Sequence, residues 1–204
     1  MAIIDGLVPE PRLHAGDEWL VVRRMIHTTA DMEMPSLVRF SPGAVEAGVA
    51  ALTSGSVIFT DTQMARAGMT ARRLGPLGCE VRCVMCEPAV ADDARERCVT
   101  RAVAAMDVAV AAAPRGVFAI GNAPTALLRL IEHMEAGRAR PALVLGMPVG
   151  FVNAAESKDL LMRRAGDIPW IAIEGRKGGS ALAAAAVNAL ADLALARRGL
   201  GAEG

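Results

Sequence analysis

The chain has 204 residues, of which 53% are hydrophobic, and its 22 basic and 22 acidic residues balance to a formal net charge of zero. A mostly apolar chain of this length can bury one sizeable core, so we expect a single domain over residues 1–204. The balanced charge, the lack of tyrosine and an aromatic content of 3% argue against a nucleic-acid-binding surface.

Short apolar runs typical of strands alternate along the chain with amphipathic segments typical of helices. The runs at 117–120 and 143–145 are apolar without interruption, as strands buried on both faces must be. This pattern predicts an α/β fold, a three-layer α/β/α arrangement with a mostly parallel central sheet. In chain order we expect helices over 17–29 and 42–52, strands over 56–60 and 80–85, a long helix over 92–112, a strand over 116–120, a helix over 124–135, a strand over 142–145, a helix over 154–164, a strand over 169–173 and a helix over 180–198.

His27, one of only three histidines, lies near the end of the first predicted helix. Imidazole has an ordinary pKa of about 6.5, so it can both donate and accept a proton at working pH. His27 is therefore the first candidate for a proton carrier. Without further context, a helical histidine is more often a packed or solvated residue than a catalytic one.

Polar, small or rigid residues follow four of the predicted strands, at 60–63, 121–125, 146–150 and 175–180. In an open parallel sheet such segments form a crevice at the carboxyl ends of the strands. Asn122 before Pro124 is typical of a helix start, and exposed amides there attract anions. The turn at 178–180, flanked by Arg176 and Lys177, is a second candidate anion site. Ordinary strand-to-helix turns use the same residue types, and that alternative stays open.

Cys79, Cys83 and Cys86 have the C-x₃-C-x₂-C spacing of the triad that holds a four-iron cluster in radical S-adenosylmethionine enzymes. The triad runs through a predicted strand, however, and Met85 stands where those enzymes usually have an aromatic residue. We favour reduced thiols without a catalytic role, and we expect no metal site.

The apolar stretch at 181–196 is rich in alanine, contains two polar residues and falls short of the roughly 20 strongly apolar residues that cross a bilayer. We therefore expect no membrane partner. The N-terminal residues show no basic segment followed by an apolar run, so we expect a cytoplasmic protein without a signal peptide.

Six motifs occur in one order along nearly the whole chain. They are IHTTAD (26–31), FTDTQM (59–64), TR (100–101), GNAPTAL (121–127), GFVNAAESK (150–158) and GRKGGS (175–180). In these motifs the chain resembles the precorrin-8 methylmutases. The versions at 28–31 and 176–180 are closer to the cobalt-precorrin-8 enzymes of the anaerobic cobalamin route than to their metal-free counterparts.

The resemblance implies a homodimer with the site near the subunit interface. It also implies an isomerase that moves a methyl group from carbon 11 to carbon 12 of a precorrin-8-type macrocycle, giving cobyrinic acid or hydrogenobyrinic acid. No cofactor is implied, since any cobalt belongs to the substrate. In that family the histidine matching His27 is the proposed proton carrier, acting on the ring C nitrogen. The residues expected to bind substrate are Thr60, Asp61, Arg101, Asn122 and Thr125.

Some points stay open beside the resemblance. Arg101 suits a carboxylate contact, because a guanidinium can hold a carboxylate through two hydrogen bonds, but it also suits a solvated helix. Asp61 can orient His27, bond a pyrrole N–H or cap the next helix. The family's N-terminal Ser-Phe pair is missing, and Ala102 stands where a serine often follows the Thr-Arg pair. A non-catalytic carrier of the tetrapyrrole product is the alternative function.

Overall fold

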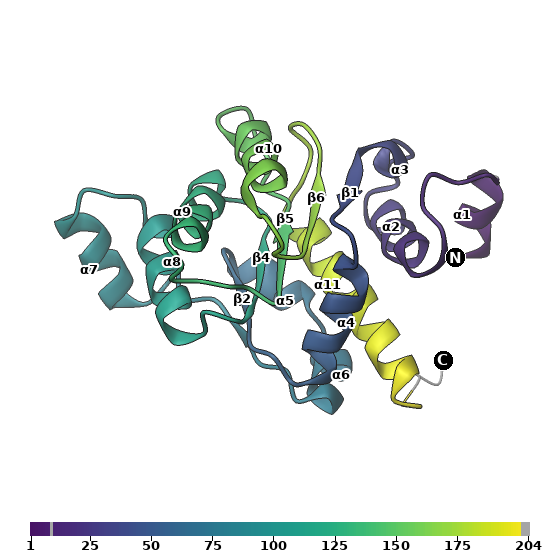
Figure 1. The fold of residues 1–204 in the computed structure, drawn as a ribbon, viewed down its shortest axis with the longest axis horizontal. Helices are drawn as coiled ribbons and strands as arrows, with labels where there is room; N and C mark the ends of the chain where they lie inside the picture. Colours follow the sequence, from purple (N-terminus) through teal and green to yellow (C-terminus); the bar gives the residue numbers. More distant parts are fainter. Residues whose placement is uncertain (9, 201–204) are drawn as a thin grey trace.

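The computed structural model describes residues 1–8 and 10–200, and it has a six-stranded sheet between two layers of helices (Figure 1). The strand order is β1-β6-β5-β4-β2-β3. β1 pairs with β6 in the antiparallel direction, and the other neighbouring pairs are parallel. The α/β fold with a mostly parallel sheet is therefore confirmed. The strands are β1 (Val38–Phe40), β2 (Ile58–Thr60), β3 (Val81–Arg82), β4 (Val117–Ile120), β5 (Leu143–Gly146) and β6 (Trp170–Ile173).

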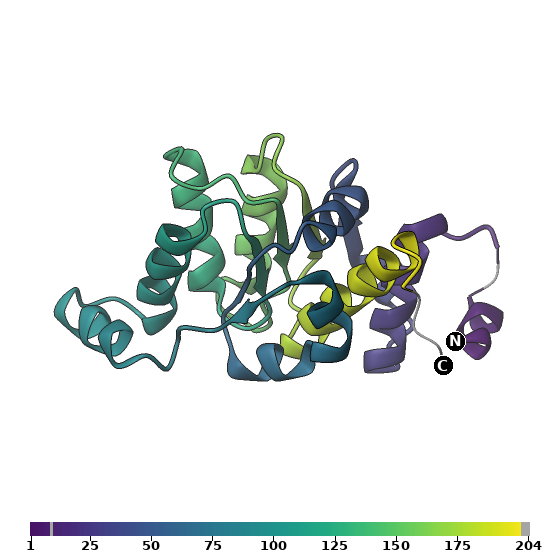
Figure 2. The same ribbon diagram turned by 90° about the horizontal axis from the view of Figure 1, so that it is seen from below.

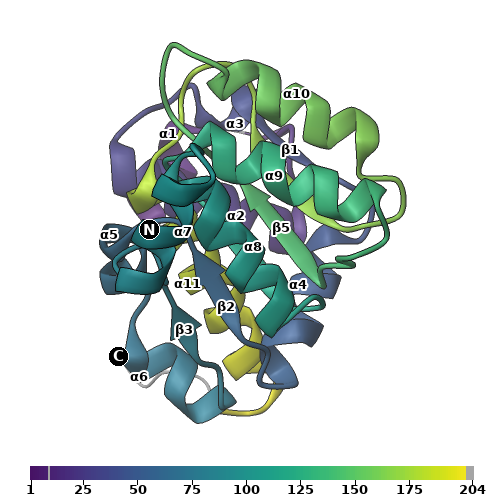
Figure 3. The same ribbon diagram turned by 90° about the vertical axis from the view of Figure 1, so that its left-hand side faces the viewer.

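Helices α8, α9 and α10 cover one face of the sheet, while α11, α4 and α2 cover the other (Figure 1 and Figure 3). Helices α1 and α7 lie at opposite ends of the molecule, as Figure 1 and Figure 2 both show. The helices are α1 (Ala2–Leu7), α2 (Gly16–Thr29), α3 (Met34–Leu37), α4 (Ala44–Thr53), α5 (Gln63–Gly68), α6 (Ala71–Leu74), the 3₁₀ helix η1 (Gly75–Leu77), α7 (Pro88–Glu96), α8 (Arg101–Ala112), α9 (Pro124–Glu135), α10 (Ala154–Arg164) and α11 (Ser180–Arg197).

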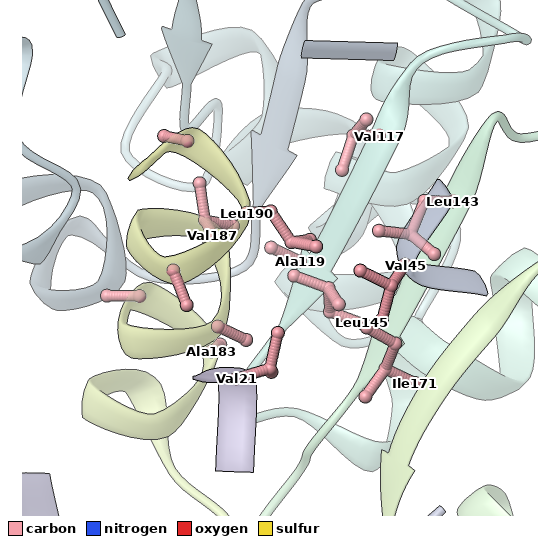
Figure 4. Close-up of a cluster of buried hydrophobic side chains, with 14 of the residues drawn as sticks. Val21, Val45, Val117, Ala119, Leu143, Leu145, Ile171, Ala183, Val187 and Leu190 are labelled. Carbon is pink, nitrogen blue, oxygen red and sulfur yellow. The ribbon is translucent and has the colours of Figure 1, made fainter. Parts of the chain in front are cut away.

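The sheet separates two apolar clusters, because successive side chains of a strand point to opposite faces. Val117 and Ala119 of β4 join the cluster formed with α2, α4 and α11 (Figure 4). Phe118 and Ile120 of the same strand join the cluster under α8, α9 and α10. Burial on both faces explains why this strand is apolar without interruption.

Helix α11 is long and apolar enough to cross a membrane by length and composition alone. However, 72% of it is buried inside the protein, where it packs against α2, α4, α5 and the sheet. Its run of alanines lets these neighbours approach closely. The helix is thus a core element of the fold.

One predicted helix needs correction, and several short elements were not predicted. The helix expected over 92–112 is two helices, because Cys98 adopts a left-handed conformation (φ 51°) between them. Thr100 then accepts the Val103 amide at 3.3 Å and begins α8. The short edge strand β1 was not expected at all, and its pairing with β6 comes from residues far apart in sequence. The short helices α1, α3, α5 and α6 were likewise missed.

Candidate active site

His27 lies in the last turn of α2, with its side chain exposed. Helices α2 and α11 run antiparallel, because Arg197 near the end of α11 pairs with Asp17 at the start of α2 at 2.6 Å. Arg24 of α2 also pairs with Asp192 of α11. Lys177, in the segment between β6 and α11, pairs with Asp31 just after α2. The His27 end of α2 therefore lies near the carboxyl edge of the sheet.

The segments that follow the strands are tied together at this edge. The Met147 amide, after β5, donates to the Ile120 carbonyl of β4 at 2.8 Å, and the Gly179 amide, after β6, donates to the Met147 carbonyl at 2.9 Å. The hydroxyls of Thr62 and Ser180 lie 2.7 Å apart. The expected crevice segments after β2, β4, β5 and β6 therefore form one connected edge.

Asp61 directly follows β2 and is buried. Its carboxylate accepts the main-chain amides of Gly121 at 3.0 Å, Asn122 at 2.8 Å and Ala123 at 2.6 Å. Burial raises the pKa of Asp61, while these three hydrogen bonds act in the opposite direction. Asp61 thus fills the amide cluster at the start of α9 that the sequence suggested as an anion site.

Two of the three sequence hypotheses for Asp61, that it caps the next helix and that it orients His27, can be compared with its contacts. The next helix, α5, is capped by Thr62, which accepts the Ala65 amide at 3.0 Å. Within the described chain, the side-chain hydrogen bonds of Asp61 go to the three amides, so it does not orient His27 through one. Asp61 instead holds the segment between β4 and α9 in place.

Thr60, the last residue of β2, is buried, and its hydroxyl has no hydrogen-bond partner among the described residues. It lines a small pocket together with Asp61, Met85, Ala102 and Ala126. An unpaired buried hydroxyl costs free energy unless something binds it. Its expected role in substrate binding stays a prediction.

The remaining expected binding residues gather where α8 and α9 begin. Arg101 is the first residue of α8 and is exposed, rather than lying inside a long helix. The Thr100 hydroxyl donates to the Thr125 hydroxyl at 3.2 Å, which joins the starts of the two helices. Asn122 is exposed, and its amide is held by Asp61. The structure therefore brings Arg101, Asn122 and Thr125 to one side of the edge.

At the second expected anion site, the turn at 178–180, one of the two flanking cations is already paired with carboxylates. The ammonium of Lys177 pairs with Asp31 at 2.6 Å and with Glu33 at 2.5 Å. Arg176 is exposed, with its guanidinium 5.8 Å from the centre of the Phe151 ring. Of the two neighbouring cations, Lys177 is engaged by carboxylates, whereas Arg176 makes no ion pair within the described residues.

Sequence reasoning did not single out the apolar side chains exposed at this edge. Phe151 is 86% exposed and Val152 is 77% exposed, in the segment between β5 and α10. Met64, just after β2, is 72% exposed. Apolar residues between Gly150 and Asn153, two residues typical of turns, were the available signal. Such side chains suit a large ligand with apolar faces.

Lys158 was also missed. It lies on α10, is fully buried, and donates from Nζ to the Lys177 carbonyl at 2.6 Å. Burial lowers the pKa of Lys158 to about 8. The sequence carried a signal, since lysine is rare in this chain, but burial itself depends on the tertiary fold.

The cysteine thiols are free, and Cys79 is half-buried with its Sγ 3.2 Å from the Leu52 carbonyl. Strand β3 is shorter than the expected 80–85, so Cys83 lies outside it. Burial raises the pKa of the Cys79 and Cys83 thiols, which disfavours the thiolate. No group of three His, Cys, Asp or Glu side chains in residues 1–8 and 10–200 is placed to hold a metal ion.

Open α/β sheets bind their ligands at the carboxyl ends of the strands, and this chain has there a connected edge of strand-end segments with exposed apolar side chains. The sequence profile described as precorrin-8X methylmutase matches residues 1–193. The chain belongs to the precorrin-8X methylmutase family. It is therefore a methylmutase, an isomerase of cobalamin biosynthesis.

Individual relatives agree with this assignment. The chain is 41% identical to the cobalt-precorrin-8 methylmutase of Priestia megaterium over 94% of this chain and 84% of the relative. It is 46% identical to the precorrin-8X methylmutase of Pseudomonas aeruginosa over 82% of this chain and 80% of the relative. The crystal structure of the precorrin-8X methylmutase from Thermus thermophilus superposes with a TM-score of 0.88 at 46% identity, covering 100% of this chain and 96% of that one.

Proposed function

We propose that this protein moves a methyl group from carbon 11 to carbon 12 of a precorrin-8-type macrocycle, with His27 as the proton carrier. The observation that carries the proposal is that the chain just after the His27 end of α2 pairs with the segment that follows β6, at the carboxyl edge of the sheet, in a chain that belongs to the methylmutase family. The relatives' names include both cobalt-precorrin-8 and precorrin-8X methylmutases, so either form is a candidate substrate.

The proposed reaction requires acid catalysis and a site shaped to hold the macrocycle, and it requires no external methyl donor. In a formal 1,5-sigmatropic shift, the bond from the methyl group to carbon 11 breaks as the bond to carbon 12 forms, without an external methyl donor. His27 donates a proton or a hydrogen bond to the ring C nitrogen, which draws electrons toward that ring. General acid catalysis of this kind contributes about 10² to 10⁴ in rate. We propose that no cofactor takes part, and any cobalt is part of the substrate.

The edge also offers contacts both for the charged periphery of such a macrocycle and for its apolar ring face. Its peripheral carboxylates suit the exposed guanidiniums of Arg101 and Arg176. Thr60, Asn122 and Thr125 are the proposed hydrogen-bonding residues, with Asp61 fixing the segment that carries Asn122. Phe151 suits the apolar face of the ring. We also propose a homodimer in the cytoplasm, and light scattering of the purified protein tests the oligomeric state.

The test is anaerobic incubation of the pure protein with cobalt-precorrin-8 and, separately, with metal-free precorrin-8, followed by the visible spectrum. Conversion of either form supports the mutase, and the faster one identifies the route. His27→Ala is expected to abolish turnover while macrocycle affinity changes by less than about tenfold. His14→Gln, at a histidine near the opposite end of α2, is the control and should keep activity. Binding without conversion by the wild type would leave a carrier.

A further inference from the structure

Only two of the 22 basic residues are lysines, and both lie in one chain of contacts at the carboxyl edge. Lys158 donates from Nζ to the main-chain carbonyl of Lys177 at 2.6 Å. Lys177 in turn reaches Asp31 and Glu33, in the segment that follows α2. The contacts thus run from α10, through the segment between β6 and α11, to the end of the helix that carries His27.

Lys158 is an unfavourable residue for stability alone. Its side chain is fully buried, and burying an ammonium group is costly when its partner is a single neutral carbonyl. An apolar side chain of similar length would fill the same space without that cost. What the ammonium adds is a directed hydrogen bond from α10 that fixes the main chain of Lys177.

The Lys177 side chain then fixes a second segment. Its ammonium lies 2.6 Å from an Asp31 oxygen and 2.5 Å from a Glu33 oxygen. The other oxygen of Asp31 accepts the Glu33 amide at 2.9 Å, so the Asp31 carboxylate and the main chain of Glu33 are fixed relative to each other. The ammonium of Lys177 joins both carboxylates and so ties this segment to the one between β6 and α11.

The end of α2 needs such support. Ala30 ends the helix in a left-handed conformation (φ 53°, ψ 24°) that an alanine adopts only at a cost. Strain of this kind persists where the surrounding structure enforces it. The ion pairs of Lys177 act on the residues immediately after Ala30, three positions beyond His27.

We propose that Lys158 and Lys177 form a latch that positions the His27 end of α2 against the segment between β6 and α11. Lys177 is then a positioning residue, acting on the reaction through His27 without touching the reacting atoms. This inference rests on the proposed function of His27. The added claim is that the segment between β6 and α11 holds the His27 imidazole in place.

The variants are Lys177→Met, which removes the charge, and Lys177→Arg, which keeps it. Arg164→Met is the matched control, because Arg164 makes a comparable exposed ion pair with Glu135 at 3.0 Å, at the far end of α10. Lys177 is 45% exposed in its side chain, so its replacement leaves the core intact. Lys158→Met removes the other half of the latch.

The first readout needs no substrate. In Lys177→Met, the Ala30 amide, which donates to the Ile26 carbonyl at 2.7 Å, should exchange with solvent about fivefold faster. The ring resonances of His27 should also shift and broaden. Lys158→Met should act in the same direction, Lys177→Arg should restore both signals, and Arg164→Met should leave them unchanged.

The second readout is turnover. In Lys177→Met, kcat should fall about tenfold while KM changes by less than about threefold, because alignment is lost and binding is kept. Wild-type exchange and ring signals in Lys177→Met would overturn the latch, as would an unchanged kcat despite faster exchange. A wild-type protein that turns over neither form of precorrin-8 would instead refute the proposed function, since the exchange and ring signals are independent of turnover.

Discussion

The carboxylate of Asp61, directly after β2, accepts the main-chain amide of Asn122, the second residue after β4, at 2.8 Å. The same carboxylate accepts the two flanking amides, so one buried charge organises the turn that leads into α9. The protein supplies its own anion to a cluster of amides that would otherwise attract one from solution. The main chain that carries the exposed Asn122 side chain is held in place as a result.

Asp61→Asn should therefore destabilise the protein and disturb the site together. The amide group of asparagine presents an N–H to a main-chain N–H, so at least one buried donor loses its acceptor. We expect a loss of about 2–4 kcal/mol in the free energy of unfolding and a raised KM. Urea unfolding and steady-state kinetics measure these. Asp92→Asn, at an exposed ion pair on α7, should change stability by less than about 0.5 kcal/mol.

Gly178→Ala should be strongly destabilising. An added Cβ would lie 2.2 Å from the Met147 carbonyl oxygen, and that atom belongs to main chain that cannot move aside. We expect a loss of about 3 kcal/mol or a shifted edge with little activity. Gly75→Ala meets nothing within 4 Å and serves as the control. Equal unfolding midpoints for the two variants in urea would contradict the close packing of these segments.

Arg101→Ala tests the carboxylate contact. Because the side chain is exposed at the start of α8, its removal should leave stability unchanged and raise KM by about tenfold, as expected for one lost charged hydrogen bond. Arg95→Ala, an exposed arginine on α7, is the matched control and should keep the wild-type KM. A normal KM in Arg101→Ala would make Arg101 an ordinary solvated helix residue.

The buried Lys158 gives a pH signature in stability. Its pKa is lowered from 10.5 to about 8 in the folded protein, so between these values the unfolded chain binds more protons. The free energy of unfolding should therefore rise with pH across this window, by about 3 kcal/mol in total. The difference between wild type and Lys158→Met, measured in urea at pH 7 to 10, isolates this effect. A difference that does not vary with pH would contradict the lowered pKa.

Asp107, which lies away from the edge, gives a second pH signature in stability, at acid pH. Arg129 and His133 each lie 2.6 Å from it, and together with Arg97 they hold the pKa of Asp107 down to about 2 despite its partial burial. Its contribution, about 2 kcal/mol, is complete above the ordinary aspartate value and disappears as the pH falls through about 2. Asp107→Asn should be less stable at pH 7 but keep kcat. A marked loss of kcat would mean that the packing of α8 on α9 reaches the site.

The order and type of most long elements could be predicted from the sequence. The helices at Pro124–Glu135 and Ala154–Arg164 were predicted with the observed bounds, because their apolar positions recur with the period of a helix and each is preceded by turn residues. The continuous apolar run of Val117–Ile120 was enough to predict a strand buried on both faces.

The errors occur where local preference is weak. β1 is three residues long and exists through its pairing with β6, so no pattern within it could predict it. The break between α7 and α8 depends on the left-handed conformation of Cys98, which an inspection of helix-forming residues passes over. Thr100 was a usable signal, because threonine is a common first residue before a helix.

For the site, the sequence by itself determined the chemistry on offer: one histidine at the end of a helix, polar segments after four strands, and motifs typical of one enzyme family. These are properties of residue type and order. The tertiary structure decided which groups meet. It paired Asp61 with amides that looked free, engaged Lys177 with two carboxylates, and buried Lys158 beneath the same segment. Each of these contacts joins residues far apart in the chain, and local sequence patterns do not predict which distant residues meet.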